Sequence, residues 1–444
     1  MTSVTQCEAM LNHVLNERAN VLARETGFVK RERKLTGASF VQVMALGHLH
    51  QPEATLDQLT QDAQVCGIQI SAPGLHQRCT ESAATFLQAV LTELIEQVVT
   101  VKAVPVALFK RFKQVIIEDA STIVLPAALA ERWQGCGGSS PGSTEHTASA
   151  LKLHVRLDLK RGQLIGPHLS AGRVHELHGP LREQLLSAGS LYVADRGYWS
   201  LSRLRELSEQ GVRFCQHPKA NTVFYDRQGK RIDLETALPR TIGQVKVMHV
   251  SLGKQDRLPV RLLMVRIPKE VVEQRRERLS EEARDKGKEV SEQQWKLAEW
   301  TLVVTNAAAK HISVEQALIL LRERWLIELL FKLWKSQGQI DAWRSQLPWQ
   351  ALCELYAKLI AVVLQHWLLL FGCWHNPWRS LVKASAVVRA LALDLLEVLS
   401  GISRLHLIVC KLRRRMQSGC RLNRRAAEPC LAQVLLEGLD WLLT

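Results

Sequence analysis

The sequence predicts an α/β fold in which a mixed sheet is flanked by helical segments at both ends of the chain. Of the 444 residues, 47% are apolar, which excludes a disordered or collagen-like chain. Between residues 111 and 219, short apolar runs alternate with helical patterns, as in sheets with parallel strands. Residues 220–305 carry consecutive β-branched runs, whereas residues 1–110 and 345–444 show the helical spacing of apolar residues.

The charge of the chain limits its partners. Lys and Arg number 58 and Asp and Glu number 43, so the formal net charge is +15. A large folded chain with this excess is expected to bind a polyanion, either nucleic acid or an anionic membrane surface. The most apolar stretch, 359–374, is short for a membrane span of about 20 residues, and we expect a buried core helix there. The N-terminal residues lack the apolar core of a signal peptide, so we predict a cytoplasmic protein that binds nucleic acid and no membrane.

The N-terminal helices include a candidate for DNA recognition. Residues 54–66 show helical spacing, Gly67 interrupts it, and a second helix is predicted from Ser71, with Pro73 in its first turn. This pair is similar to a helix-turn-helix, although an ordinary helical hairpin has the same spacing. The polar side chains that could reach DNA from this region are His76, Gln77 and Arg78, together with Lys30 and Arg31 of a basic patch at 30–34. A solvated charged surface is the alternative for that patch.

Two aspartates directly follow predicted strands. The apolar run 115–117 ends in Glu118 and Asp119, and the run 191–194 ends in Asp195. Ligands of open α/β sheets bind at the carboxyl ends of strands, so both aspartates are placed where chemistry occurs, although Asp is also a common turn residue there. The other elements predicted for this region are strands at 151–159 and 212–215 and helices at 177–188 and 201–210.

Residues 220–305 are predicted to form a β-rich insertion in the α/β domain. Its predicted strands are 222–225, 245–250, 260–265 and 301–305. Residues 269–296 hold eight basic and eight acidic residues. This balance predicts a salt-bridged, solvent-exposed helical segment, with Gly287 as the turn of a helical hairpin.

A further helix is predicted from the capping box at 313–316 to residue 335. Glu328 lies within its apolar stretch, with Arg324, Lys332 and Lys335 within roughly 80° on the same face. An exposed ladder of ion pairs would have this spacing, but the bulky apolar neighbours favour burial of the helix. A buried carboxylate needs a partner, and a metal ion is one candidate.

Asp119, Asp195 and Glu328 together predict a magnesium site. The ten cysteines include no C-x-x-C pair and match no zinc template, so reduced thiols are expected. Mg²⁺ takes oxygen ligands and binds through few carboxylates plus phosphate, and Mn²⁺ could substitute. Two such ions about 4 Å apart can activate a water or a 3′-hydroxyl and stabilise the leaving oxygen in phosphoryl transfer.

The segments around these three carboxylates resemble the DDE transposases of the insertion-sequence-4 family. They read Ile-Ile-Glu-Asp-Ala-Ser-Thr at Asp119, Val-Ala-Asp-Arg-Gly-Tyr at Asp195 and Arg-Trp-Leu-Ile-Glu-Leu-Leu-Phe-Lys at Glu328. That family carries a Tyr-x2-Arg-x3-Glu-x6-Lys signature, which Arg324, Glu328 and Lys335 match in register. Leu321 stands at the tyrosine position. The resemblance extends from about residue 20 to about residue 345.

The resemblance implies an RNase H-like catalytic core, formed by residues 111–219 and 306–345 and interrupted by the insertion at 220–305. A helical DNA-binding domain at 1–110 and a helical domain at 346–444, for dimerisation or DNA contact, would flank this core. The implied activity is cut-and-paste movement of an insertion sequence, with 3′-end nicking, hairpin formation and opening, and strand transfer. An RNase H-like nuclease without strand transfer and an inactive, DNA-binding descendant are the alternatives.

The resemblance also implies partners and contacts. The partners are the terminal inverted repeats, the target DNA and a second copy of the chain in a synaptic complex. The implied location is a bacterial cytoplasm, with the protein on the nucleoid when it is bound to DNA. Trp300, on the strand that returns from the insertion, would stack on a flipped base. The remaining candidates for DNA contact near the carboxylates are Arg196, Tyr198, Arg324, Lys332 and Lys335.

Overall fold

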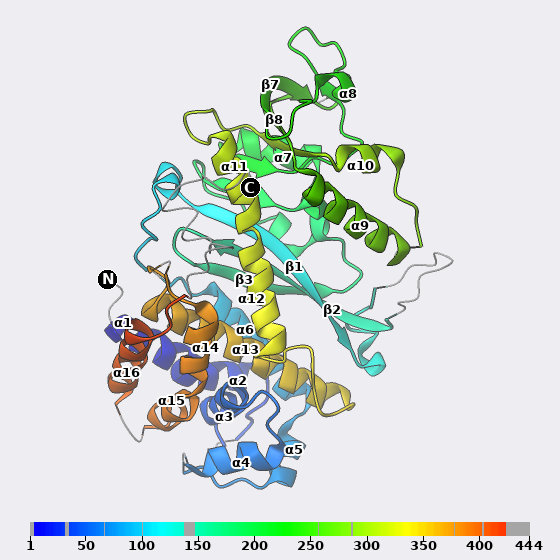
Figure 1. Cartoon of the computed structure of the whole chain (residues 1–444). Helices are drawn as coiled ribbons and strands as arrows, with labels where there is room; N and C mark the ends of the chain where they lie inside the picture. Colours follow the sequence, from blue (N-terminus) through cyan, green and yellow to red (C-terminus); the bar gives the residue numbers. More distant parts are fainter. Residues whose placement is uncertain are drawn as a thin grey trace.

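The computed structural model describes residues 4–31, 35–65, 67–99, 101–136, 147–255, 257–285, 287–376, 378–401 and 404–422. A sheet and its covering helices form one part of the molecule, and a body of helices forms the other (Figure 1). The mixed α/β class with helices at both ends is therefore confirmed. Residues 137–146 and the residues after 422 lie outside the described part of the chain.

The helical body is built from both ends of the chain. Its N-terminal helices are α1 (Val4–Asn12), α2 (Ala19–Glu25), α3 (Gly37–His50), α4 (Leu56–Val65), α5 (Ala72–Arg78) and α6 (Glu81–Glu96), with a π-helical turn at His13–Arg18. Its C-terminal helices are α13 (Pro348–Gly372), α14 (Leu381–Arg389), α15 (Ala392–Leu399) and α16 (Leu405–Ser418). Helix α13 packs against α3 and α6, α15 packs against α3, and α16 packs against α1, so the two terminal segments share one apolar core.

Helix α13 is the central helix of this body. Its buried residues lie around the whole circumference and are mostly apolar, and such a helix is stable only when neighbours cover every side. By length and composition it could cross a membrane, but nearly all of its most apolar window is buried inside the molecule. The buried core helix predicted at 359–374 is confirmed.

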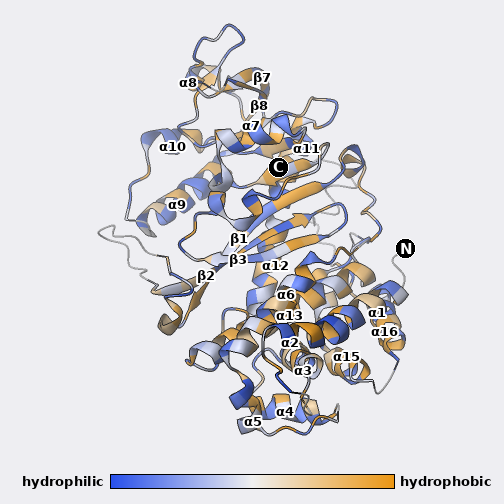
Figure 2. Cartoon of the chain, turned by 180° about the vertical axis from the view of Figure 1, so that it is seen from behind, coloured by the Kyte–Doolittle hydropathy of each residue, from blue (hydrophilic) through white to orange (hydrophobic). Residues whose placement is uncertain are grey.

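The sheet has nine strands in the order β3-β2-β1-β4-β5-β9-β8-β7-β6. The strands are β1 (Val115–Leu125), β2 (Ser149–Asp158), β3 (Leu164–Ala171), β4 (Leu191–Ala194), β5 (Arg213–Gln216), β6 (Phe224–Tyr225), β7 (Val245–Leu252), β8 (Leu258–Arg266) and β9 (Trp300–Thr305). Strands β1, β4 and β5 are parallel, and the other pairs are antiparallel. Hydrophobic residues run along these strands in Figure 2. Strand β9 pairs with both β5 and β8, so the strands of 220–305 extend the same sheet.

The helices on the sheet follow their sequence signals. They are α7 (Leu201–Glu209), α8 (Leu234–Ala237), α9 (Lys269–Asp285), α10 (Glu292–Leu297), α11 (Val314–Glu323) and α12 (Trp325–Ser336). The capping box is present: the Ser313 hydroxyl accepts from the Gln316 amide, and the Gln316 side chain accepts from the Ser313 amide. The predicted helical hairpin is also present, since α9 and α10 flank Gly287, whose φ is +58°.

Three local predictions are wrong. Residues 177–188 form short 3₁₀ turns instead of a helix, because Gly179–Pro180 interrupts them and a residue before proline avoids the helical region. Strand β3 was not predicted. Its Pro167 lacks an N–H group, which an edge strand tolerates. The helix expected to run from 313 to 335 is divided at Arg324 into α11 and α12.

Candidate active site

The sheet brings Asp119 and Asp195 next to each other. Strands β1 and β4 are parallel and pair up to Glu118 and Ala194, so the next residues along the two strands are Asp119 and Asp195. Asp195 directly follows β4, as predicted, and its Oδ1 accepts from the Gly197 amide at 2.7 Å. Asp119 was expected to follow a strand, and this is wrong because β1 continues to Leu125 by pairing with β2. Asp119 nevertheless lies where the parallel pairing ends.

Helix α12 places Glu328 and Arg324 against this edge. The Arg324 guanidinium lies 2.5 Å from Oε1 of Glu328 and 3.8 Å from Oδ2 of Asp119. At the other end of α12, Nζ of Lys335 donates to the carbonyl of Thr122 in β1 at 3.1 Å. Arg324 therefore links the carboxylates of the helix and the sheet, and Lys335 fixes the helix on β1.

The carboxylates repel one another. The pKa of Asp119 is raised to about 7, chiefly because the carboxyl group is buried. The charges of Asp195 and Glu328 raise it further, while the Ala120 amide and Arg324 oppose the shift. The raised pKa is therefore that of a buried carboxyl group that has two other acids beside it.

The donor set has the chemistry of a divalent-cation site. Asp119, Asp195 and Glu328 offer hard carboxylate oxygens, and a cation among them would relieve the repulsion that raises the pKa of Asp119. Within the described part of the chain, however, no three His, Cys, Asp or Glu side chains are already grouped around a common point. Glu328 is instead paired with Arg324, so a metal would have to replace that guanidinium as its partner.

A cavity of about 420 Å³ connects this edge of the sheet to Trp300. Asp195, Arg196 and Arg324 line one part of it, and Trp300 lines another. The Trp300 indole N–H donates to the carbonyl of Pro239 at 2.8 Å, and the Arg266 guanidinium lies 4.9 Å from the centre of the ring. The indole is thus held in place on its edge and stacked on one side.

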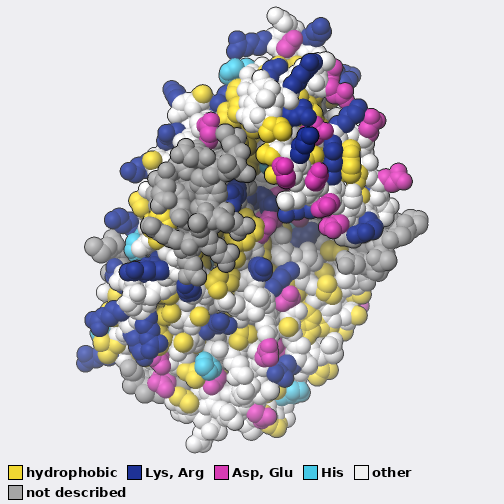
Figure 3. All heavy atoms as spheres, viewed as in Figure 1, with side chains coloured by type: hydrophobic (Ala, Val, Ile, Leu, Met, Phe, Trp, Pro, Cys, Tyr) yellow, Lys and Arg dark blue, Asp and Glu magenta, His cyan; other side chains and the backbone are white. Residues whose placement is uncertain are grey.

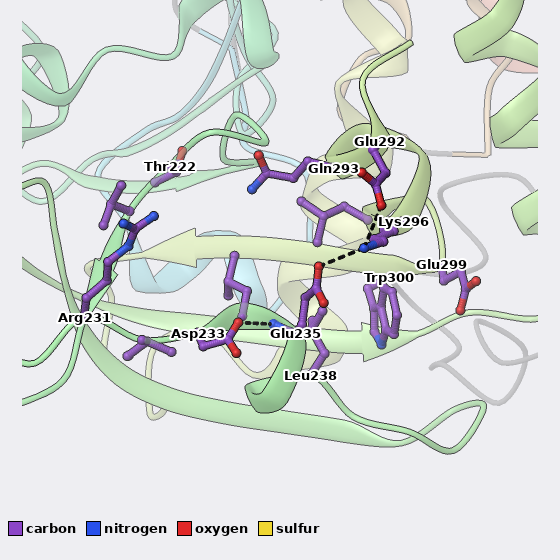
Figure 4. A pocket seen from close by; sticks show the side chains of 14 residues that line it. Thr222, Arg231, Asp233, Glu235, Leu238, Glu292, Gln293, Lys296, Glu299 and Trp300 are labelled. Carbon is purple, nitrogen blue, oxygen red and sulfur yellow. Dashed lines mark hydrogen bonds and ion pairs between the residues drawn. The ribbon is translucent and has the colours of Figure 1, made fainter.

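Trp300 also lines a second cavity, of about 640 Å³, inside the 220–305 region. Figure 4 shows Lys296 here between Glu235 and Glu292, at distances of 3.3 and 3.0 Å. These exposed ion pairs balance its charge locally. In the cavity that contains Asp195, the Lys and Arg side chains outnumber the carboxylates.

The other predicted contact residues occupy different environments. Arg196 and Lys332 are exposed, whereas Tyr198 is only 3% exposed and belongs to a buried apolar cluster. The Tyr198 hydroxyl has no hydrogen-bond partner among the described residues. Tyr198 is therefore not presented to the surface in this structure.

The N-terminal candidates lie far from the carboxylates. Helices α4 and α5 form the expected pair, with Gly67 at φ +73° between them and the Ser71 hydroxyl capping α5. They occupy the end of the helical body opposite the sheet (Figure 1). Gln77 is exposed, and Arg78 lies 6.0 Å from the ring of Phe28.

The N-terminal basic patch is only partly described. Lys30 and Arg31 are exposed, and the rest of the patch, 32–34, lies outside the described residues. His76 of the predicted recognition helix bonds to Gln350 of α13, which ties α5 to the helical body.

Sequence reasoning missed two features of the site. Arg275 and Arg278 of α9 line the cavity beside Asp195, although their helix was predicted to be charge-balanced and solvent-exposed. Their spacing of three residues places both on one face of a helix, which was a readable signal. The second feature is the buried ion pair between Glu118 and Arg156, at 2.6 Å, on the face of β1 opposite Asp119.

Comparison with known proteins shows the family of the chain. A family model described as "Transposase DDE domain" matches residues 110–364. The chain is 27% identical over 379 residues to the transposase for insertion sequence element IS231E of Bacillus thuringiensis subsp. finitimus, covering 80% of this chain and 78% of that protein. It is 23% identical to the transposase for IS1151 of Clostridium perfringens, over 78% and 76% of the two chains. It is 25% identical to the transposase for IS421 of Escherichia coli, over 80% and 92%. The family model covers more than half of the sequence, and the chain belongs to the DDE transposase family.

Proposed function

We propose that the chain is the transposase of a bacterial insertion sequence of the insertion-sequence-4 group and that it cuts and joins DNA by two-metal phosphoryl transfer. One observation carries this proposal. Asp119 and Asp195 directly follow the last residue pair of the parallel β1–β4 pairing, and Arg324 contacts both Asp119 and Glu328 of helix α12. The register of Arg324, Glu328 and Lys335 agrees with the signature of that group.

Asp119, Asp195 and Glu328 would hold two Mg²⁺ ions, for which Mn²⁺ would substitute. When bound, the ions supply an activated nucleophile and charge stabilisation for the leaving oxygen. Once Glu328 exchanges Arg324 for a cation, the guanidinium is free to bind a phosphate beside the scissile bond. Lys332, which is exposed on α12, is placed for a neighbouring phosphate.

We further propose an RNase H-like core at 111–219 and 306–345. The strand order β3-β2-β1-β4-β5, with β1, β4 and β5 parallel, supports it. The insertion would be 220–305, the DNA-binding domain 1–110 and the dimerisation or DNA-contact domain 346–444. Two copies of the chain would pair two inverted repeats in a synaptic complex, in the cytoplasm and on the nucleoid.

Trp300 is proposed to stack on a base flipped out during hairpin formation. Its ring lines the same cavity as Asp195 and Arg324, which supports the role. Leu321, at the tyrosine position of the signature, has no hydroxyl for phosphate. This single departure is the only sequence feature that favours an inactive descendant.

A substitution of Glu328 tests the proposal. Glu328→Gln is expected to abolish Mg²⁺-dependent cleavage of a duplex that carries the element end, because an amide is a poorer metal ligand, while DNA binding stays close to wild type. Glu277→Gln, an exposed residue of α9, is the matched control and should cleave normally. Cleavage by Glu328→Gln at the wild-type rate would refute the assignment of Glu328.

A further inference from the structure

The cavity beside Asp195 is lined by an excess of positive charge. Its cationic side chains are Arg196, Lys219, Arg275, Arg278 and Arg324, and its carboxylates are Asp195 and Glu282. Glu282 interacts electrostatically with Arg196, and Arg324 is paired with Glu328. The described ion pairs include none to Arg275 or Arg278, so these two guanidinium groups hold most of the uncompensated charge.

Arg275 is already fixed in the wall of this cavity. One of its terminal nitrogens donates to the carbonyl of Trp300 at 3.1 Å, and the other donates to the hydroxyl of Thr301 at 2.8 Å. Both acceptors are neutral, so they orient the guanidinium without cancelling its charge. The pKa of Arg275 is lowered to about 10, chiefly by burial and then by the nearby charges of Arg196 and Arg278. Like charges held this close are unfavourable until an anion binds among them.

Arg278 complements this fixed charge. It lies one turn further along α9 and is exposed, so it can move toward a ligand at little cost. Figure 3 shows Lys and Arg side chains gathered in a hollow of the surface beside the charged α9. The cavity has room for part of a nucleotide chain, since ligand sites of about 300–1,000 Å³ are common.

We propose that Arg275 and Arg278 of α9, together with Arg196, bind a backbone phosphate of the DNA strand that passes from Asp195 to Trp300. Guanidinium groups bind phosphate oxygens through two parallel hydrogen bonds, which suits a cluster of three around one anion. The insertion would thus contribute a phosphate clamp as well as an aromatic platform. This inference rests on the proposed function, because that function supplies the DNA strand.

The test compares two variants that remove one positive charge from the same helix. Arg278→Gln removes a clamp residue. Arg284→Gln removes an exposed arginine that lies about 180° around the helix from Arg275 and does not line the cavity. Binding of a fluorescent duplex carrying the element end is measured by anisotropy in EDTA, between about 50 and 200 mM salt. Melting temperatures should match wild type for both variants, because both residues are exposed.

Arg278→Gln is expected to bind about tenfold more weakly and to lower the slope of log affinity against log salt by about 0.9. Arg284→Gln should leave that slope unchanged. In wild type, one uncharged methylphosphonate at the clamped position should also weaken binding by about tenfold, and the loss should be smaller in Arg278→Gln, in which one of the three guanidinium groups is absent. Equal salt slopes for the two variants would overturn the clamp. So would the absence of any methylphosphonate position at which Arg278→Gln is less sensitive than wild type. The slope can be measured on any duplex. If the wild-type protein shows no preference for the element end, the proposed function is refuted, but the slopes still show whether the phosphate clamp exists.

Discussion

Removing the ion pair behind Asp119 should destabilise the whole sheet. Arg156 lies on β2 and Glu118 on β1, with their side chains 1% and 6% exposed and their charged atoms 2.6 Å apart. Arg156 also donates to the carbonyls of Gln184 and Leu181, at 2.9 and 2.6 Å. The Arg156→Met substitution keeps much of the side-chain volume but removes all three bonds.

The expected loss of stability is large because one charge stays buried. Breaking a buried ion pair by removing one partner costs about 3–5 kcal/mol, since the other charge is left without compensation. Here the remaining charge is the carboxylate of Glu118. The two carbonyls that lose their donor lie in the turns between β3 and β4, so the connection that leads to Asp195 should loosen as well.

Urea denaturation followed by circular dichroism measures this loss, with Arg182→Met as the control. Arg182 pairs with Glu206, but both side chains are about one-third exposed, so its replacement should cost about 1 kcal/mol or less. The double variant Glu118→Gln/Arg156→Met should recover part of the loss, because no unpaired charge remains. A loss below about 1 kcal/mol for Arg156→Met, or one equal to that of Arg182→Met, would refute this reasoning.

Three further predictions concern the site. The pKa of Asp119 is raised to about 7, so the metal-free protein loses folding stability as the pH rises from the ordinary Asp pKa through 7. Asp119→Asn should therefore raise the melting temperature more at pH 8 than at pH 5, and an equal gain at both pH values would contradict this. On a denaturing gel, Trp300→Ala should still form the first nick but no hairpin, and Trp300→Phe should form part of the wild-type amount of hairpin. An undiminished amount of hairpin in Trp300→Ala would exclude the stacking role. In Gly197→Ala, the new Cβ would lie 2.5 Å from Oε2 of Glu176 and 3.0 Å from Oδ1 of Asp195. DNA cleavage should therefore fall with little change in melting temperature, and normal cleavage would show that the two carboxylates move aside.

The sequence predicts elements best where local signals are strong. Strand β4 is a short apolar run that ends in Asp195, and the start of α11 has a capping box, so both were located correctly. Helix α13 is apolar over most of its length, and its burial followed from that composition. In these segments local preference and tertiary packing agree.

The prediction fails where tertiary contacts decide. Strand β1 continues past Asp119 only because β2 pairs with residues 119–125, and this partner is distant in sequence. Arg275 belongs to a helix with six acidic and five basic residues, and only the packing of α9 over the cavity leaves its charge uncompensated. The pairing of Arg324 with both Asp119 and Glu328 likewise depends on how α12 docks on the sheet.

The product pattern of the wild-type protein on its own DNA tests the proposed transposase activity most directly. The protein is incubated with Mg²⁺ and an end-labelled duplex that carries the native element end, and the products are separated on a denaturing gel. We expect a nick at one phosphodiester at the element boundary, followed by a hairpin, with neither product in Glu328→Gln. Scattered cuts would indicate a nuclease without strand transfer, and specific binding without cleavage would indicate an inactive descendant; either result contradicts the proposed function.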